Sequence, residues 1–555
     1  MRKKQLLCLS LAFMCAAGLT ACGSTAPEAT TGVVIEQSET TAAVEEDTTE
    51  ATTAEEKKEE TDGPVIEEDF ETETPIAEAR GPVTLTYVDG GMDGSKALEI
   101  SGRTDAWNGV NFNCDAYRGN KIRVNVNAKS KGKSVRLSIQ YDVDGITSYN
   151  WITSGSTTPD AMAFITGTYD VPADVENIFV YVESDTTDDI TIDDLKIMAE
   201  GKYVEPKAIE KKEMADISGY ESMKDIYADD FKIGVCINPA VVENPDYSAL
   251  IKQQFNSVTC ENNMKPESIL DKAGSLEDLT DGGTHLKVDM SACEAELQFA
   301  IDNGMQVRGH TLVWHSQTPD WIFYVDYDTS KELADRDLML TRLDNYLNDV
   351  FTWAKENHDG LFYAWDVVNE AMEDNGKMRD SLWYQTIGED YLEQVYAIAR
   401  KYAPEGVKLF YNDYNAYQST KQNAIIEALR PVAEAGNLDG VGMQGHLYTG
   451  EDPEHFAKCA KRYADELGVV VHITEIDVEQ PSGGNPEGDQ GKYYGNLFKA
   501  LKDAKANGVP IESVSIWGLT DSLSWKAGNK PLLFNGDLTG KLAFYQIIQE
   551  GKKAE

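Results

Sequence analysis

The chain has 555 residues, of which 41% are hydrophobic, so it is long enough for two or more domains with buried cores. Its formal net charge of −45 at pH 7 repels phosphates and argues against a nucleic-acid partner. A neutral polymer remains compatible as a ligand.

Residues 1–21 have the pattern of a bacterial export signal, with a basic start at residues 2–4 and an apolar stretch over 6–19. The sequence Leu-Thr-Ala-Cys at 19–22 resembles a lipobox. That resemblance implies cleavage before Cys22, acylation of its thiol and a lipid-anchored, extracytoplasmic protein, which we expect at the cell surface. The alternatives are plain secretion or a membrane-spanning anchor, although about 14 apolar residues are short of the ~20 that span a bilayer.

Residues 22–66 are rich in Thr, Ala and Glu and have no apolar periodicity, which predicts a disordered, extended tether. Five cysteines remain beyond Cys22, with wide spacings and no CxxC pair, so neither a disulfide framework nor a zinc site is indicated. We expect them to be buried free thiols. They are Cys114, Cys236, Cys260, Cys293 and Cys459.

Residues 67–200 contain short runs of alternating polarity, such as VTLTYV, KIRVNVNAK and NIFVYVES, separated by Gly, Asn and Asp. This pattern predicts an all-β jelly roll or sandwich. Residues 201–215 are then a linker with a charged stretch.

Residues 216–550 alternate apolar strand candidates with helical stretches, which predicts a (β/α)₈ barrel. A doubly wound open sheet is disfavoured, because no glycine-rich phosphate loop follows the first strand. The eight candidates are FKIGVCI, NSVTCEN, MQVRGHTLVWH, FYAWDVVNE, VKLFYND, LDGVGMQGH, GVVVHITEID and VSIWGLTD.

Polar and aromatic residues lie at the predicted C-terminal ends of seven strands, where (β/α)₈ barrels place their active sites. Two of them, Glu370 and Glu475, form the carboxylate pair typical of a retaining glycosidase. The whole set comprises Glu261, Asn262, Lys265, His310, Trp314, His315, Gln317, Asp366, Asn369, Glu370, Asn412, Asp413, Gln444, His446, Glu475, Asp477, Trp517 and, in the loop beyond, Trp525. No HExxH-type spacing occurs, so we expect no metal in the catalytic domain and no catalytic cofactor.

The same region resembles the glycoside hydrolase family 10 endo-β-1,4-xylanases. The resemblance rests on VTCENNMKPE, VRGHTLVWHSQTP, WDVVNE, GMQGHL, ITEID and WGLTDSLSW, in that order along the chain. Two departures, Ile476 for a usual Leu and Leu542 for a common Pro, lie away from the chemistry.

The resemblance implies a role for each member of the catalytic set. Glu475 is the nucleophile, and Glu370 is the acid that protonates the leaving oxygen and then the base that activates water. His446 keeps Glu475 ionised and oriented, with Asp477 behind it, and Asn369 bonds the 2-hydroxyl of the −1 sugar.

The resemblance also implies a substrate-binding set: Glu261, Asn262, Lys265, His310, Trp314, Gln317, Gln444, Trp517 and Trp525. The amides and charged groups would bind sugar hydroxyls, and the tryptophans would offer apolar faces to pyranose rings. Packing roles are the alternatives for Trp314, Trp517, His310 and His446. For His315 and His472 packing is as good an explanation as sugar contact, and Asp366 and Asp413 are expected to be supporting residues.

Residues 67–200 resemble a family 22 carbohydrate-binding module in LEISGRTDAWNGV, GTYDVPAD, IFVYVES and ITIDDLKI, although the Trp usual after Phe70-Glu71 is absent. The resemblance implies a sugar-binding set of Arg80, Trp107, Tyr149, Tyr181 and Glu183. A core role is the alternative for Trp107 and Tyr181. The resemblance also implies a structural calcium, ligated by Asp193 or Glu71.

The resulting hypothesis is a monomeric, lipid-anchored enzyme that cuts xylan internally with retention of configuration. One alternative is a related enzyme acting on β-1,4-glucan, because the space around Trp517 and Trp525 decides whether a hydroxymethyl group fits. The other is a lipoprotein that binds glycans without cutting them, which predicts a degenerate glutamate pair.

Overall fold

The structure is a computed structural model that describes residues 63–72, 76–132, 134–143, 146–208 and 213–552. The signal, Cys22 and most of the tether expected over 22–66 lie outside these residues. Among the described residues, no helix combines the length and hydrophobicity needed to cross a membrane.

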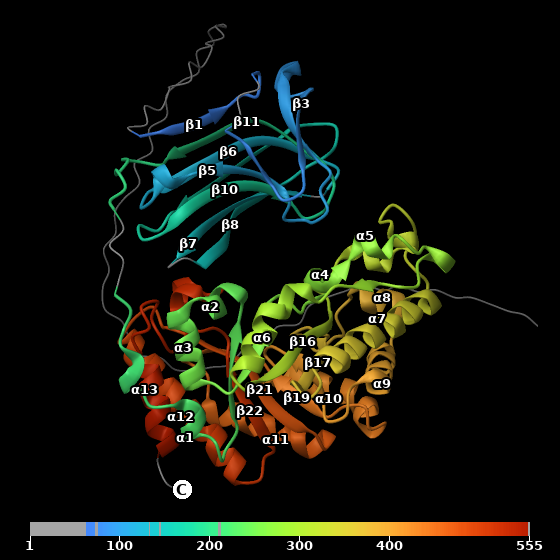
Figure 1. Ribbon diagram of the computed structural model, residues 1–555, viewed down its shortest axis with the longest axis vertical. Coiled ribbons are helices and arrows are strands. Elements are labelled where there is room, and N and C mark those ends of the chain that lie inside the picture. The colour runs from blue at the N-terminus through green and yellow to red at the C-terminus, as the bar shows by residue number, and fades with distance from the viewer. Residues whose placement is uncertain (1–62, 73–75, 133, 144–145, 209–212, 553–555) are drawn as a thin grey trace, which may run out of the picture. The chain divides into compact units, whose positions relative to one another are not determined.

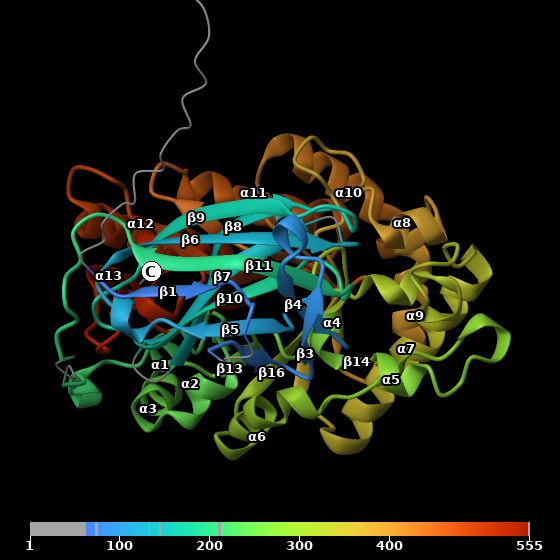
Figure 2. The ribbon, with the colours of Figure 1, turned by 90° about the horizontal axis from the view of Figure 1, so that it is seen from above.

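The N-terminal domain is a sandwich of two antiparallel sheets (Figure 1). One sheet has the order β3-β4-β11-β6-β9, with β1 also paired to β11, and the other has the order β2-β5-β10-β7-β8. Figure 2 looks onto the first sheet, in which β11, β6 and β9 run side by side. The strands are β1 (Val65–Glu68), β2 (Glu78–Arg80), β3 (Thr84–Asp89), β4 (Lys96–Ser101), β5 (Gly109–Asn113), β6 (Lys121–Ser130), β7 (Ser134–Val143), β8 (Ile146–Ser156), β9 (Ala163–Asp170), β10 (Glu176–Ser184) and β11 (Ile190–Ala199).

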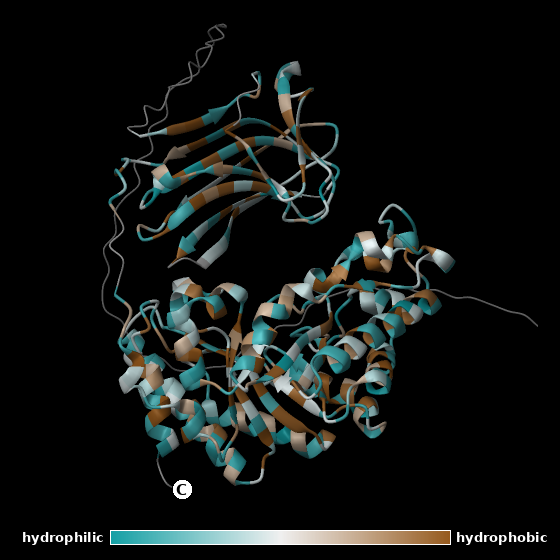
Figure 3. Cartoon of the chain, in the orientation of Figure 1, coloured by the Kyte–Doolittle hydropathy of each residue, from teal (hydrophilic) through white to brown (hydrophobic). Residues whose placement is uncertain are grey.

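Alternating polarity along the strands produces this sandwich. On β6 every second residue from Ile122 to Ala128 is buried in the core, and the residues between them face solvent. The same alternation appears as brown and teal bands along the strands of the sandwich in Figure 3. Phe70 is fully buried in the core, so it anchors the start of the domain even though the expected Trp is missing.

The second domain is a closed barrel of eight parallel strands, which confirms the predicted fold and rules out an open sheet. The ring closes because β12 pairs with β22 and β19 pairs with β21. The barrel strands are β12 (Lys232–Ile237), β13 (Ser257–Cys260), β16 (Gln306–Trp314), β17 (Phe362–Asn369), β18 (Lys408–Asp413), β19 (Gly440–Met443), β21 (Val470–Glu479) and β22 (Ile511–Ile516). The remaining strands are β14 (Leu270–Asp271), β15 (Lys287–Val288) and β20 (His446–Tyr448), which pairs with β21.

Helices surround the barrel strands (Figure 1). Several begin at a capping residue followed by proline: before Pro245 the Asn244 side chain accepts from the Asp246 and Tyr247 amides, and before Pro453 the Asp452 side chain accepts from the Glu454 amide. The helices are α1 (Met223–Ile226), α2 (Pro239–Glu243), α3 (Pro245–Gln254), α4 (Pro266–Ile269), α5 (Lys272–Ser275), α6 (Glu294–Asp302), α7 (Arg336–Asn357), α8 (Leu382–Ile387), α9 (Tyr391–Tyr402), α10 (Ser419–Glu434), α11 (Pro453–Leu467), α12 (Pro486–Ala506) and α13 (Leu542–Lys552).

The five cysteines beyond Cys22 are free and buried, as predicted from their spacing. Burial raises the pKa of the Cys114 thiol to about 12 and raises those of the other four as well. They are therefore neutral apolar residues at physiological pH.

A buried polar chain runs through the barrel below the strand ends. Arg308 on β16 donates through Nε to Asp366 Oδ2 at 3.0 Å, and its Nη2 pairs with Asp366 Oδ1. Asp366 also accepts from His310 Nδ1 at 2.9 Å, and Arg308 Nη1 lies 2.7 Å from His472 Nδ1. Burial alone would raise the pKa of Asp366, but Arg308 and His310 outweigh it and lower that pKa. Asp366 and His472 are thus supporting residues, as expected for Asp366.

We predict that Arg308→Met destabilises the barrel strongly, by about 3–5 kcal/mol, because it leaves the buried Asp366 carboxylate without its cation. The midpoint of thermal unfolding measures the effect. Lys499→Met is the matched control, since Lys499 pairs with Asp503 on the exposed face of α12. Equal midpoints for the two variants would contradict the assigned role of Arg308.

Candidate active site

Glu475 is a buried carboxylate, 5% exposed, in the second half of β21. The ladder with β19 ends at Ile473, so Glu475 lies just beyond it, although β21 itself continues to Glu479. Its Oε1 accepts from Asn412 Nδ2 at 2.7 Å, and its Oε2 lies 3.3 Å from His446 Nε2. Burial alone would raise the pKa of Glu475, but His446, His310 and Asn412 outweigh it and lower that pKa. Glu475 is therefore held as an anion.

His446 lies between two carboxylates. Its Nδ1 is 2.8 Å from Asp477 Oδ2, opposite the contact of Nε2 with Glu475. Burial opposes protonation of the imidazole, but these two acids outweigh it and raise the pKa of His446 to about 9. Asp477 also accepts from Trp525 Nε1 at 2.9 Å and pairs with Lys526 Nζ at 3.3 Å. A protonated imidazole therefore stabilises and orients the Glu475 anion.

Glu370 follows the last residue of β17 in an uncommon backbone conformation, with φ of 57°. Hydrogen bonds hold this turn from several sides. Its N–H donates to Asn412 O at 2.9 Å, and its carbonyl accepts from Arg379 Nε at 3.0 Å. The next N–H, that of Ala371, donates to Tyr411 Oη at 3.1 Å. The neighbouring chain thus fixes the direction in which Glu370 projects.

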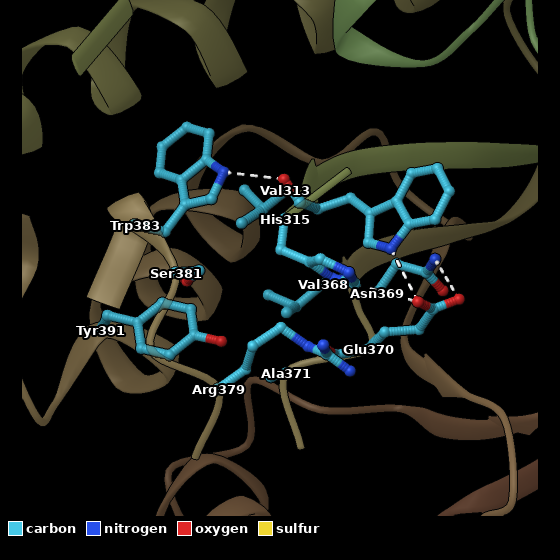
Figure 4. Close-up of a pocket in the computed structure, with 11 residues that line it drawn as sticks. Val313, His315, Val368, Asn369, Glu370, Ala371, Arg379, Ser381, Trp383 and Tyr391 are labelled. Atoms are coloured by element: carbon cyan, nitrogen blue, oxygen red, sulfur yellow. Dashed lines mark hydrogen bonds and ion pairs between the residues drawn. The ribbon is translucent and has the colours of Figure 1, made fainter. Parts of the chain in front are cut away.

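The Glu370 carboxylate accepts hydrogen bonds from three side chains. Trp314 Nε1 donates to Oε2 at 2.9 Å, Gln444 Nε2 to Oε1 at 2.9 Å, and Asn369 Nδ2 to Oε1 at 3.3 Å. His315 Nδ1 is 4.0 Å from Oε2. Figure 4 shows the Asn369–Glu370 contact in a pocket whose lining includes Glu370 but not Glu475.

An amide bridge joins the two carboxylates. Asn412 Nδ2 donates both to Glu475 and, at 2.9 Å, to Asn369 Oδ1, while Asn369 contacts Glu370. Asn412 Oδ1 in turn accepts from Thr474 Oγ1 at 2.7 Å. Sequence reasoning placed Asn412 at a strand end without giving it a role. Its position between the carboxylates depends on pairing between β17 and β18, which no local motif reveals.

A second buried acid lies below Glu370. Asp413 is fully buried and accepts from Tyr411 Oη at 2.5 Å, and its Oδ1 lies 2.8 Å from Lys421 Nζ. Burial and the charge of Glu370 outweigh Lys421 and raise the pKa of Asp413 to about 7. Asp413 is therefore a supporting residue, as expected, because it positions Tyr411, which holds the Glu370 turn. Tyr411, Lys421 and Arg379 are functional residues that sequence reasoning missed.

Part of the expected substrate-binding set gathers around Lys265. Lys265 Nζ donates to Asn262 Oδ1 at 2.9 Å and to Gln317 Oε1 at 2.8 Å, and it lies 4.9 Å from the ring centre of Trp314. Burial lowers the pKa of Lys265, although Glu475, Glu261 and Glu370 oppose that shift. Glu261 accepts from Asn238 Nδ2 at 3.0 Å. This cluster presents amide and ammonium groups suited to hydroxyls.

The expected aromatic residues differ in exposure. Trp517 is only 8% exposed and meets His310 edge-on at 5.5 Å between ring centres, whereas Trp525 is 60% exposed and lies 5.1 Å from His446. Gln444 links the two glutamates, because its Nε2 donates to Glu370 Oε1 at 2.9 Å and its carbonyl accepts from the Glu475 N–H at 2.7 Å. Trp314, Asn369, Gln444 and His446 therefore contact one of the two glutamates directly, and Lys265, Asp477 and Trp525 contact one of those residues.

Of the five residues expected to bind sugar on the sandwich, the three aromatic ones surround the guanidinium of Arg80. Arg80 Cζ lies 3.8 Å from the ring centre of Tyr181, 5.2 Å from that of Trp107 and 5.6 Å from that of Tyr149. Glu183 accepts from Ser138 Oγ at 2.8 Å. Tyr181 is only 4% exposed and lies beneath Arg80.

The residues expected to ligate calcium are already hydrogen-bonded within the protein. Asp193 accepts from the Met92 and Asp194 amides and from Ser95 Oγ, and Glu71 accepts from the Lys96 amide. Within the described residues, no group of three or more His, Cys, Asp and Glu is arranged to hold a metal ion. The calcium therefore stays a prediction.

We predict that the His446 imidazole carries protons on both nitrogens at pH 7.5. Its pKa of about 9 lies above the ~6.5 of an unfolded histidine, so its contribution to stability is complete below pH 6.5 and is lost as the pH rises towards 9. Histidine ¹⁵N NMR measures the titration. His472 is an internal control, because burial lowers its pKa to about 4 and it should stay neutral. A midpoint near 6.5 for His446 would refute the arrangement.

Comparisons with known proteins agree with this geometry. Residues 222–550 match the model of glycosyl hydrolase family 10, and residues 63–189 match a model described as a carbohydrate binding domain. The chain is 34% identical to endo-1,4-beta-xylanase A of Thermotoga maritima over 87% of this chain and 46% of that protein. It is 37% identical to endo-1,4-beta-xylanase B of Butyrivibrio fibrisolvens over 59% of this chain and 53% of that protein.

Among solved structures, the chain is similar to the CBM22-1–GH10 modules of Clostridium thermocellum endo-1,4-beta-D-xylanase 10B, solved with xylohexaose. The TM-score is 0.57 at 28% identity, and the match covers 88% of this chain and 98% of that one. The chain spans about half the length of the two curated relatives. Its family match covers more than half of its residues and includes both glutamates, so the chain belongs to glycosyl hydrolase family 10.

Proposed function

We propose that the protein is an endo-β-1,4-xylanase that retains anomeric configuration. The observation that carries this proposal is the contrast between the two carboxylates. Glu475 is buried as an anion against a protonated His446, whereas Glu370 accepts hydrogen bonds from the neutral side chains of Trp314 and Gln444, and His315 Nδ1 lies 4.0 Å from it. One group is suited to attack and the other to transfer protons.

In the first step Glu475 attacks the anomeric carbon as the glycosidic C–O bond breaks, and Glu370 donates its proton to the leaving oxygen. In the second step Glu370 takes a proton from water, and the water oxygen replaces Glu475 on the same carbon. Two displacements restore the starting configuration. Asn369, fixed by Asn412, would bond the 2-hydroxyl of the reacting sugar, a contact that strengthens in the transition state.

Xylan is the proposed substrate because xylose lacks the hydroxymethyl group of glucose. Trp517 is nearly buried beside His310, so its ring is not free to move aside for an added group, and the Trp525 ring is positioned by its hydrogen bond to Asp477. Both curated relatives described above carry the name endo-1,4-beta-xylanase. The sandwich would bind the same polymer through the aromatic rings around Arg80.

We further propose that the protein acts as a monomer held by a lipid on Cys22 at the cell surface, with residues 22–66 as the tether. The lipobox-like sequence at 19–22 supports this location. The expected calcium in the sandwich would be revealed if a chelator lowers the midpoint of thermal unfolding of that domain.

We predict that the wild type releases reducing sugar from β-1,4-xylan much faster than from carboxymethylcellulose, and that Glu370→Ala and Glu475→Ala each lose at least about 10³-fold in rate. Product anomers are followed by NMR during hydrolysis. Undiminished hydrolysis by Glu475→Ala would remove the nucleophile assignment. An inverted first product would exclude the two-step mechanism, and a preference for carboxymethylcellulose would favour the glucanase alternative.

We predict that Cys22→Ser abolishes labelling by a fatty-acid probe in a bacterial host and releases the protein from membranes. Cys114→Ser is the matched control, because Cys114 is buried in the sandwich and would not be acylated. Equal membrane association of the two variants and the wild type would argue against the lipid anchor.

A further inference from the structure

The outer face of the five-stranded sheet carries a tryptophan that belongs to no site described so far. Trp151, on the edge strand β8, is 66% exposed. It pairs with Ser138 on β7, and Ser138 pairs with Tyr181 on β10. Alternation along β10 sends Val180 and Val182 into the core, so Tyr181, Ser138 and Trp151 lie on the opposite, outer face.

Trp151, Ser138 and Tyr181 form a row of outward-facing residues across three strands. The row continues beyond Tyr181 to Asn111 on β5, which pairs with Tyr181. Val110 and Phe112 are buried in the core, so Asn111 also faces outward. Its Oδ1 is buried and has no hydrogen-bond partner among the described residues. A buried acceptor of this kind is unfavourable unless a hydroxyl of a ligand or of water donates to it.

The row passes through the cluster around Arg80, which is rigidly held. Arg80 donates to the Trp107 carbonyl at 2.5 Å and to Gln140 Oε1 at 3.2 Å, and Gln140 pairs with Tyr149 one row along. Tyr149 and Trp151 therefore stand on the same face of β8, two residues apart. Between Trp151 and Tyr181 lies Ser138, which is buried and donates to Glu183 Oε1 at 2.8 Å, so Glu183 borders the row at this point.

We infer that Asn111 and Trp151 are additional sugar-binding residues, and that the xylan chain bound at Arg80 extends along this row to the edge strand β8. The inference rests on the proposed binding of xylan by the sandwich. Trp151 supplies a flat apolar face for a pyranose ring, and Asn111 supplies an acceptor for a sugar hydroxyl. Continuity with the Arg80 cluster identifies the occupant as the same glycan chain, so the module binds long chains better than short ones.

Binding of xylohexaose and xylotriose to the full chain tests the inference by calorimetry. All variants carry Glu475→Ala, which prevents turnover and makes the contribution of the catalytic domain the same in each. Trp151→Ala and Asn111→Ala are compared with Tyr181→Ala as the reference for a damaged module. Phe164→Ala is the matched control, because Phe164 is 64% exposed but lies on β9 of the other sheet. Thermal unfolding confirms that each variant is folded.

Trp151→Ala is expected to weaken hexaose binding at the sandwich roughly three- to tenfold, Asn111→Ala by a smaller factor and Phe164→Ala not at all. Triose binding should change less in Trp151→Ala than hexaose binding does. If Trp151→Ala and Asn111→Ala match Phe164→Ala while Tyr181→Ala is weaker, the extended row is wrong and the module still binds xylan. If Tyr181→Ala also matches the control, the sandwich does not bind xylan, and both the inference and that part of the proposed function are wrong.

Discussion

The site depends on keeping one buried carboxylate ionised. Moving the Glu475 carboxylate out of water favours its neutral form, and the protein reverses that tendency with His446 on one oxygen and Asn412 on the other. His446 is itself stabilised as a cation by Asp477, and Lys526 pairs with Asp477 on its far side. Two acids and two bases thus alternate through the site, so no member is left as an isolated buried charge.

The position of Glu370 is fixed in a different way, by the conformation of its backbone. Its left-handed turn is maintained by Asn412 and Tyr411 of β18 and by Arg379 from the loop after β17. The buried Asp413–Lys421 pair then fixes Tyr411 from below. Strain at one residue persists because the surrounding packed structure over-determines it. The same residue, Asn412, contacts both glutamates, so the positions of the acid and the nucleophile are linked.

The sequence predicts those features that depend on local pattern. Alternation over 67–200 predicted the sandwich, eight apolar runs predicted the barrel, and polar residues after those runs predicted that Glu370 and Glu475 belong to one site. Arg379 could not be found this way, because it comes from a loop and acts through its contact with the Glu370 carbonyl. Asn111 and Trp151 also escaped, since their common row depends on a register across four strands. Long-range pairing places these groups, and no single segment encodes it.

The central claim is that Glu475 is the buried anion that forms a covalent bond to the sugar. A xylobioside with fluorine at C2 and a dinitrophenolate leaving group slows the second step and allows that adduct to accumulate. Peptide mapping by mass spectrometry then locates the added sugar. The account predicts one fluoroxylobiosyl group on Glu475, with no label in Glu475→Ala. A label on Glu370, or turnover of this probe without any adduct on Glu475, would contradict it.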